Sequence, residues 1–342
     1  MSTTHSPHRP EPVLEPHDVQ VLLRAAVRAP SLHNTQPWAF GFGEQHVELY
    51  ADSSRHLQQA DATGRSLLVS CGAALFNLRV AAAHLGMHPR VRVLPDEEDP
   101  TLVAVVETHH RHSRSGSLDG YYPAVWLRRT NRLPFRDRRV PPSTIGRLAE
   151  AATLEGAVLR VYDDEAEVQR VVDLMHDADL EDRADLARTT ERQAWIGGHH
   201  RLEGIPVRSL GPRPTGLRAA FRDLGYAVST VRESAVFEST PTVAVLSTVQ
   251  DRPVDWVRAG QALERVLLEA TVSGLSVSFL NQPLEHSDLR WQVRNPLTGV
   301  GHTHMLLRIG YGEQVPLTPR RPLEEARREP RLRRTLGEAP SG

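Results

Sequence analysis

The sequence contains no lysine: all 41 of its Lys and Arg residues are arginine. Schiff-base formation, pyridoxal-phosphate anchoring and a P-loop each require a lysine amine, so the sequence excludes these three chemistries. No G-x-G-x-x-G follows a predicted strand, and no G-x-S-x-G is present. A Rossmann nicotinamide domain and an α/β-hydrolase nucleophile elbow are therefore not supported.

Cysteine is represented by Cys71 alone, so the chain can form no internal disulfide. This usage fits a reducing compartment. Cys71 lies inside an apolar helical pattern, which favours a buried structural role over a reactive thiol.

Excess charge and long apolar runs are also missing. The formal net charge is −1, which gives no electrostatic reason to expect a nucleic-acid or anionic-membrane partner. No apolar run predicts a membrane span, so we expect a soluble, cytoplasmic protein without a membrane partner. His109, His110 and His112 lack a fourth ligand at suitable spacing, so no metal site is predicted.

The 342 residues are enough for two domains or one large one. We divide the chain into a disordered lead (1–16), a first half (17–110), a linker (111–120), a second half (121–323) and a charged tail (324–342). Within the second half, residues 188–237, which contain two adjacent glycines and the Pro/Gly-rich stretch GPRPTG, predict a long irregular insertion, a candidate lid.

Hydrophobic periodicity predicts the regular elements. Helices are expected over 17–29, 67–85, 143–152 and 256–272, and strands near 47–49, 91–94, 102–106, 157–162, 242–247, 276–280 and 305–309. Residues 73–91 and 261–279 share one pattern: a long helix rich in small residues, a glycine stop, then a strand. The two halves therefore indicate an internal duplication.

Two stretches carry most of the chemistry. Residues 30–38 (PSLHNTQPW) place amide and hydroxyl side chains between two prolines, which suits a planar heterocycle with donors and acceptors. Residues 128–132 (RRTNR) offer three guanidiniums that can converge on a phosphate. Together they predict a nucleotide-like cofactor.

These stretches resemble the P-S-x-x-N-x-Q-P-W and R-x-S-x-R motifs of nitroreductase-like flavoproteins. With the arginines second, their order is similar to that of the Acg-type branch, which is associated with actinobacteria. The resemblance extends through residues 71–78, 279–283 and 319–323. It implies an α+β nitroreductase-like fold with mixed β-sheets flanked by helices. Because family members are usually homodimers, the two halves resemble both subunits fused as an intramolecular pseudo-dimer.

The resemblance also assigns the phosphate contacts of an FMN cofactor. Arg128, Thr130 and Arg132 match the phosphate and ribityl contacts, and Arg320 and Arg321 match further phosphate arginines. The chain departs from the common pattern at Thr318, where a lysine often stands. One positive charge is thereby lost from the expected phosphate site.

The ring contacts come from two further segments. Pro30, Ser31 and Asn34 match residues that lie against the flavin ring, and Asn77 either reaches the carbonyl edge of the ring or is a packing amide. Leu280, Asn281 and Gln282 match the loop that places a backbone N–H near the flavin N5; an acidic residue is common where Asn281 aligns.

The first half lacks the arginine motif and the second half lacks the proline-serine motif, so one complete site is expected: one FMN per chain, in a monomer. The resemblance implies an oxidoreductase that passes hydride from NAD(P)H through FMN to an electron-poor acceptor such as a quinone or nitro compound. The alternative is a protein that stores FMN under the insertion without efficient turnover.

Overall fold

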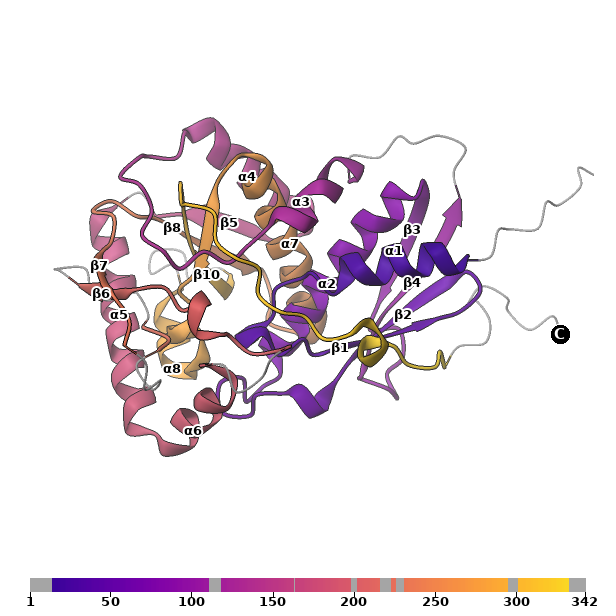
Figure 1. The fold of residues 1–342 in the computed structure, drawn as a ribbon, viewed down its shortest axis with the longest axis horizontal. Coiled ribbons are helices and arrows are strands. Elements are labelled where there is room, and N and C mark those ends of the chain that lie inside the picture. The colour runs from indigo at the N-terminus through magenta and orange to yellow at the C-terminus, as the bar shows by residue number, and fades with distance from the viewer. Residues whose placement is uncertain are drawn as a thin grey trace, which may run out of the picture.

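The computed structural model describes residues 14–110, 118–162, 164–197, 202–215, 223–225, 231–294 and 301–331. Two four-stranded antiparallel sheets lie on opposite sides of two long helices that pack against each other (Figure 1). Helices packed with antiparallel β-sheets give the α+β architecture that the sequence predicts.

The first half contains α1 (Pro16–Ala26), β1 (Trp38–Phe42), β2 (His46–Ala51), α2 (Arg65–His84), β3 (Met87–Val93) and β4 (Leu102–His110). Its sheet has the order β1-β2-β4-β3. α1 begins with Pro16 in its first turn and buries Leu22, Leu23, Ala25 and Ala26. Leu14, which the sequence analysis placed in the lead, is buried, and its N–H donates to the Glu44 carbonyl at 2.7 Å.

The second half contains α3 (Tyr122–Leu127), α4 (Pro142–Thr153), β5 (Val158–Val161), α5 (Glu165–Ala184), α6 (Leu186–Trp195), β6 (Arg213–Thr215), β7 (Ser234–Val236), β8 (Thr242–Thr248), α7 (Pro253–Val272), β9 (Ser276–Phe279), α8 (Ser287–Gln292) and β10 (His302–Gly310). Its main sheet has the order β5-β8-β10-β9, and β6 and β7 form a separate pair.

The two halves have the same topology. In each half a helix, two sheet strands, a long helix and two sheet strands occur in this order, and the last strand of each lies inside its sheet. In the second half, α5, α6, β6 and β7 are inserted between β5 and β8, and α8 lies between β9 and β10. The long helices α2 and α7 end at Gly86 and Gly274, whose φ values are 75° and 71°. Glycine tolerates this left-handed backbone, which makes it a natural helix stop. The repeated order supports the internal duplication; the fusion of two subunits stays our interpretation of it.

The halves meet where α2 crosses α7. A Cβ atom added to Gly72 would lie 2.2 Å from the Val257 carbonyl oxygen, and one added to Gly260 would lie 2.0 Å from the Val69 carbonyl oxygen. The two helix backbones therefore touch at this crossing. Cys71 is fully buried on the same helix, where burial raises the pKa of its thiol far above the usual value, in keeping with a structural role.

α2 corrects one expectation. It has the length and the apolar composition of a membrane span, with a mean hydropathy of 1.5 in its most apolar 18-residue window, whereas the sequence analysis expected no such run. Yet 72% of that window is buried inside the fold. The apolar composition of α2 is thus explained by its place between the two sheets.

The insertion also differs from expectation. Residues 188–237 were expected to be irregular, but α6 occupies residues 186–195, and α5 precedes it within the same excursion between β5 and β8. Asp164 caps α5 and Asp185 caps α6, each accepting a backbone N–H. Local capping therefore supplies helix starts in a polar segment whose hydrophobic pattern is weak.

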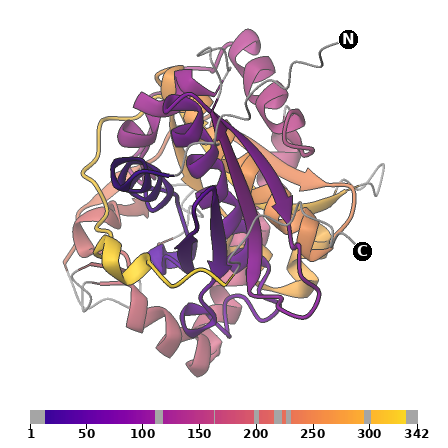
Figure 2. The same ribbon diagram turned by 90° about the vertical axis from the view of Figure 1, so that its right-hand side faces the viewer.

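A C-terminal strap, residues 311–331, crosses from the second half to the first (Figures 1 and 2, yellow). Arg327 bridges to Phe40 of β1, and the Arg328 N–H donates to the Phe40 carbonyl at 2.9 Å. The described part of the predicted charged tail thus packs on the first sheet. Of the predicted linker, only residues 118–120 lie within the described part of the chain.

Candidate functional site

One cavity lies between the two halves, with an empty volume of about 970 Å³ including its solvent-facing part. Its walls come from the loop before β1, from α2, from the segment before α4, from the ends of β9 and β10, from the insertion and from the strap. Segments far apart in sequence thus converge on one space.

Most of the predicted site residues line this cavity. They are Pro30, Ser31, Asn34, Arg128, Thr130, Arg132, Asn281 and Arg320. Thr130 forms a parallel bridge with Val277, which aligns the arginine segment alongside β9. The structure therefore joins the two motifs that the sequence places about a hundred residues apart.

Four predicted residues lie outside the cavity lining. Leu280 packs in an apolar cluster with α5, and Gln282 donates its Nε2–H to Asp182 at 2.7 Å. The Arg321 guanidinium donates to the carbonyl oxygens of residues 36 and 38. Asn77 is fully buried between α2 and α7. The side chains of these four residues therefore support the cavity walls from behind.

The loop before β1 has a strained backbone. His33, Asn34 and Gln36 have φ values of 46°, 58° and 53°, in the left-handed region that non-glycine residues seldom adopt. The Ser31 Oγ accepts the Gln36 N–H at 2.9 Å and closes the loop. Such strain persists only where surrounding contacts fix it, and it clusters at functional sites.

Asn34 connects three of the cavity walls. Its Nδ2 donates to the Gly204 carbonyl at 2.9 Å and to the Pro319 carbonyl at 3.1 Å, and its Oδ1 accepts from Arg320 at 2.9 Å. The amide therefore joins the loop, the insertion and the strap. The predicted contact of Asn34 with the flavin ring would require the ligand to replace one of these hydrogen-bond partners.

Guanidinium groups gather at one end of the cavity. Arg128 donates to the Arg28 carbonyl at 3.0 Å, and its Nε lies 3.4 Å from the Glu264 carboxylate. Burial, together with Arg128 and Arg28, holds the pKa of Arg320 well below its usual value, and burial lowers the pKa of Arg129 to about 10. Cations held close together against their mutual repulsion favour an anionic ligand.

Arg320 also has a positioning role. Its guanidinium donates to the carbonyl oxygens of Val27, Arg28 and Ala29 at 2.7–3.0 Å, just past the end of α1. Cations are favoured at the C-terminal ends of helices, where carbonyls lack helical partners. Arg320 therefore fixes the strap to α1 while lining the cavity.

Glu264 on α7 faces this arginine cluster and is fully buried. Burial raises the pKa of its carboxyl to about 7, with Arg128 and the Asn77 amide acting in the opposite direction. A carboxyl with a pKa near physiological pH can exist in either form. When ionised it pairs with Arg128, and when protonated it leaves the Arg128 guanidinium to pair with an anionic ligand.

The opposite end of the cavity holds residues that the sequence analysis missed. Arg65, at the start of α2, donates to the carbonyl oxygens of Leu284 and His304, both at 2.9 Å. Arg65, Glu285, His304 and Met305 all line the cavity. An arginine that opens an apolar helix after Gly64 was a signal for Arg65. The fold alone reveals His304.

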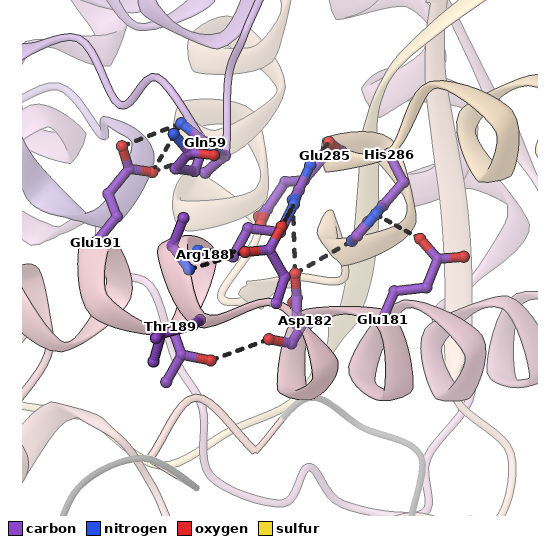
Figure 3. A network of polar contacts seen from close by, with 12 residues as sticks. Gln59, Glu181, Asp182, Arg188, Thr189, Glu191, Glu285 and His286 are labelled. Atoms are coloured by element: carbon purple, nitrogen blue, oxygen red, sulfur yellow. Dashed lines mark hydrogen bonds and ion pairs between the residues drawn. The ribbon is translucent and has the colours of Figure 1, made fainter.

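The insertion is attached to the second half through Asp182 on α5 (Figure 3). This buried carboxylate accepts from Gln282 at 2.7 Å, from His286 at 3.1 Å and from Arg192 of α6. Because Gln282 and His286 flank the short turn after β9, the network fixes α5 and α6 against the loop that contains Asn281.

The insertion is also attached to the first half. The Glu191 carboxylate accepts the N–H groups of Gln59 and Ala60 at 2.9–3.2 Å (Figure 3 shows Glu191 beside Gln59). Ile205 and Leu224 of the insertion line the cavity. The insertion thus contacts both halves and covers part of the space between them.

Comparison with known proteins assigns the family. No protein-family model matches the chain. "Putative NAD(P)H nitroreductase Rv3131" of Mycobacterium tuberculosis is 31% identical over 313 residues, 90% of each chain. "Putative NAD(P)H nitroreductase acg" of the same species is 30% identical over 326 residues, covering 92% of this chain and 97% of that protein. Among solved structures, the FMN-dependent nitroreductase NfnB of Mycobacterium smegmatis in complex with NADPH is 17% identical, with a TM-score of 0.39, over 63% of this chain and all (100%) of its own.

These relatives span nearly the whole chain. The chain belongs to the nitroreductase-like family, in its Acg-type branch.

Proposed function

We propose that this protein binds one FMN in the cavity between its halves and acts as an NAD(P)H-dependent oxidoreductase for a small electron-poor acceptor, such as a quinone or nitro compound. The observation that carries the proposal is the convergence of eight residues named by the family motifs on one cavity. Both curated relatives bear the name of an NAD(P)H nitroreductase.

The cavity has the donor set that FMN requires. Arg128, Thr130 and Arg132 offer cations and a hydroxyl for a phosphate and a ribityl chain, and the neighbouring guanidiniums raise the local positive charge. Apolar side chains such as Val69 and Phe279 offer walls for a planar ring. FMN, when bound, supplies the hydride chemistry, and the protein residues bind and orient it.

The pseudo-symmetry supports one FMN per chain. In the second half, the connection from α4 to β5 corresponds to the PSLHNTQPW loop of the first half. It carries Glu155, which pairs with Arg79 at 2.5 Å and with Arg265 at 2.8 Å. An ion-pair cluster thus stands where a second ring-binding loop would be, so we propose a monomer with a single site.

FMN storage remains a second candidate function, and the insertion favours it. Ile205 and Leu224 cover part of the cavity, and Asp182 and Glu191 fix the insertion to the two halves. A fixed cover would hinder stacking of a nicotinamide on the flavin ring.

Anaerobic mixing of the FMN-loaded protein with NADH or NADPH separates the two functions. An oxidoreductase loses the visible absorbance of oxidised flavin within its turnover time, and the colour returns when a quinone is added. A storage protein is bleached slowly by NAD(P)H but readily by dithionite. Glu191→Gln weakens the attachment to the first half, so it should speed bleaching if the insertion is the barrier. Slow bleaching in both forms would contradict the oxidoreductase proposal.

A further inference from the structure

A β-bulge turns His304 into the cavity. The register of β10 against β8 shifts between Thr303 and Met305, so that His304 is the extra residue. Successive residues of a regular strand face opposite sides of the sheet, and a bulge re-aims one of them. Here the neighbours His304 and Met305 both line the cavity.

The hydrogen bonds of Thr248 fix the tautomer of His304. The Thr248 hydroxyl has one hydrogen, and it donates this hydrogen to the Gln250 carbonyl at 2.6 Å. The His304 Nε2, which lies 2.6 Å from the same hydroxyl oxygen, must therefore be the donor in that contact. The Nδ1 of His304 is then an acceptor with a free lone pair.

Within the described part of the chain this Nδ1 atom has no hydrogen-bond partner, although the residue is only 1% exposed. A buried acceptor without a partner is costly, and because His304 lines the cavity, a bound ligand can supply the missing donor. Burial, with Arg65 and Arg290 close by, lowers the pKa of His304 to about 3. The imidazole therefore stays neutral, and its lone pair stays available at physiological pH.

His304 and the arginine cluster lie at different ends of the cavity. Arg65, which donates to the His304 carbonyl, begins α2, and Asn77 follows 12 residues later on the same helix. At 1.5 Å per residue, the two positions are about 18 Å apart. Asn77 lies beside Glu264, the partner of Arg128. A ligand whose phosphate meets Arg128 therefore presents its other end to His304.

Donors flank the His304 acceptor. The Asn281 Oδ1 accepts the Leu306 N–H at 2.8 Å, and its Nδ2 donates one hydrogen to the Met305 Sδ at 3.5 Å, which leaves the second Nδ2 hydrogen for a ligand. Two of the five Arg65 N–H groups bond to the carbonyls of Leu284 and His304. Glu285, the acid at this end, has its carboxylate 3.8 Å from Arg192. The wall thus offers a donor–acceptor–donor set.

We propose that His304 is a flavin-binding residue whose Nδ1 accepts a hydrogen bond from the imide N3–H of the isoalloxazine ring. The imide edge of an oxidised flavin presents a carbonyl, an N–H and a carbonyl in sequence, which complements Asn281, His304 and Arg65. N3–H is also the one N–H of the oxidised ring. The inference rests on the proposed FMN binding and names the residue that distinguishes the imide edge from other ring edges.

The test compares FMN with 3-methyl-FMN, in which a methyl group replaces the imide hydrogen. Both are titrated into the flavin-free protein, and quenching of flavin fluorescence gives the dissociation constants. The wild-type protein should bind 3-methyl-FMN about tenfold more weakly than FMN, the scale of one buried hydrogen bond. This comparison requires no substitution and so does not depend on the folding of a variant.

Two variants distinguish lost hydrogen bonding from steric exclusion of the methyl group. His304→Gln keeps an amide donor for Thr248 but offers no acceptor at the Nδ1 position. It should bind FMN about tenfold more weakly than wild type, with no further loss for 3-methyl-FMN. His304→Asn places an amide oxygen near the Nδ1 position and should bind FMN within about threefold of wild type. Thermal unfolding midpoints control for folding.

Equal wild-type binding of FMN and 3-methyl-FMN would overturn the assignment of His304. So would a His304→Gln variant that binds FMN as tightly as wild type, or one that discriminates the two flavins as strongly. Failure of the wild-type protein to bind FMN at all is a different result, and it would overturn the proposed function itself.

Discussion

Arg128 lies between the cavity and the buried Glu264, so its guanidinium can interact with both a ligand and the Glu264 carboxylate. We expect Arg128→Ala to weaken FMN binding by about 1.5–3 kcal/mol, the loss typical of a charge-assisted hydrogen bond to phosphate. Arg129 is the matched control, because its guanidinium donates to the carbonyls of Trp126 and Arg128 and does not line this cavity. Fluorescence titration measures both variants. Loss of binding in Arg129→Ala with retention in Arg128→Ala would show that the motif register is off by one.

Glu264 gives the protein a stability term that depends on pH. Its folded-state pKa of about 7 lies above the ordinary value of 4.5, so the folded state holds the proton more tightly. The resulting stabilisation is complete below pH 4.5 and disappears as pH rises through 7. Relative to Glu264→Gln, wild type should lose on the order of 3 kcal/mol of unfolding free energy across this window. Urea denaturation at pH 5 and pH 8 measures it; parallel pH profiles for the two proteins would contradict the buried carboxyl.

Single residues also mark the limit of what the sequence could predict at the site. The two motifs identified Arg128, Thr130 and Asn34 because the side-chain chemistry of these residues can be recognised from the sequence alone. His304 was not found, because a bulge in β10 places it and the strand pattern around it is polar. Gln282 and Arg321 match motif positions, yet their side chains bond to protein groups outside the cavity lining.

Among the elements, the α2–α7 crossing allows a direct test of packing. Gly260→Ala puts a Cβ within 2.0 Å of the Val69 carbonyl, so the helices must separate. We expect a loss of about 1–3 kcal/mol of unfolding free energy, the usual cost of overpacking. Gly146→Ala is the control: Gly146 is helical in α4, and no atom of the described residues lies within 4 Å of its Cβ position. This variant should gain about 0.5–1 kcal/mol of unfolding free energy. Urea denaturation compares them, and a neutral Gly260→Ala would refute the close crossing.

The predictability of the elements follows their hydrophobic patterns. α2 and α7 were located within a few residues because small apolar side chains run to a glycine stop in both. α5 and α6 were not predicted, since α5 is strongly acidic, α6 is polar, and the burial of both depends on contacts with the turn after β9. Leu14 was assigned to a disordered lead because nothing local indicates its contact with Glu44.

At the scale of the molecule, the two halves share one topology but contribute different residues to the site. The first half contributes a strained ring-binding loop, and the second contributes the arginines and the Asn281 loop. The cavity between them therefore needs both halves, whereas the pseudo-equivalent position holds the Glu155 ion pairs. The sequence predicted the duplication. It did not predict the ion-pair cluster at the pseudo-equivalent position, because Glu155, Arg79 and Arg265 come from three separate elements.

The most direct test of this account is the stoichiometry of FMN. The protein is titrated with FMN, the free flavin is removed, and the flavin released by heat is identified against FAD and riboflavin standards and counted per chain. A single complete site predicts FMN at one equivalent per chain, in a particle with the mass of a monomer. A protein that retains no FMN, or one that retains two equivalents per chain, would contradict the account.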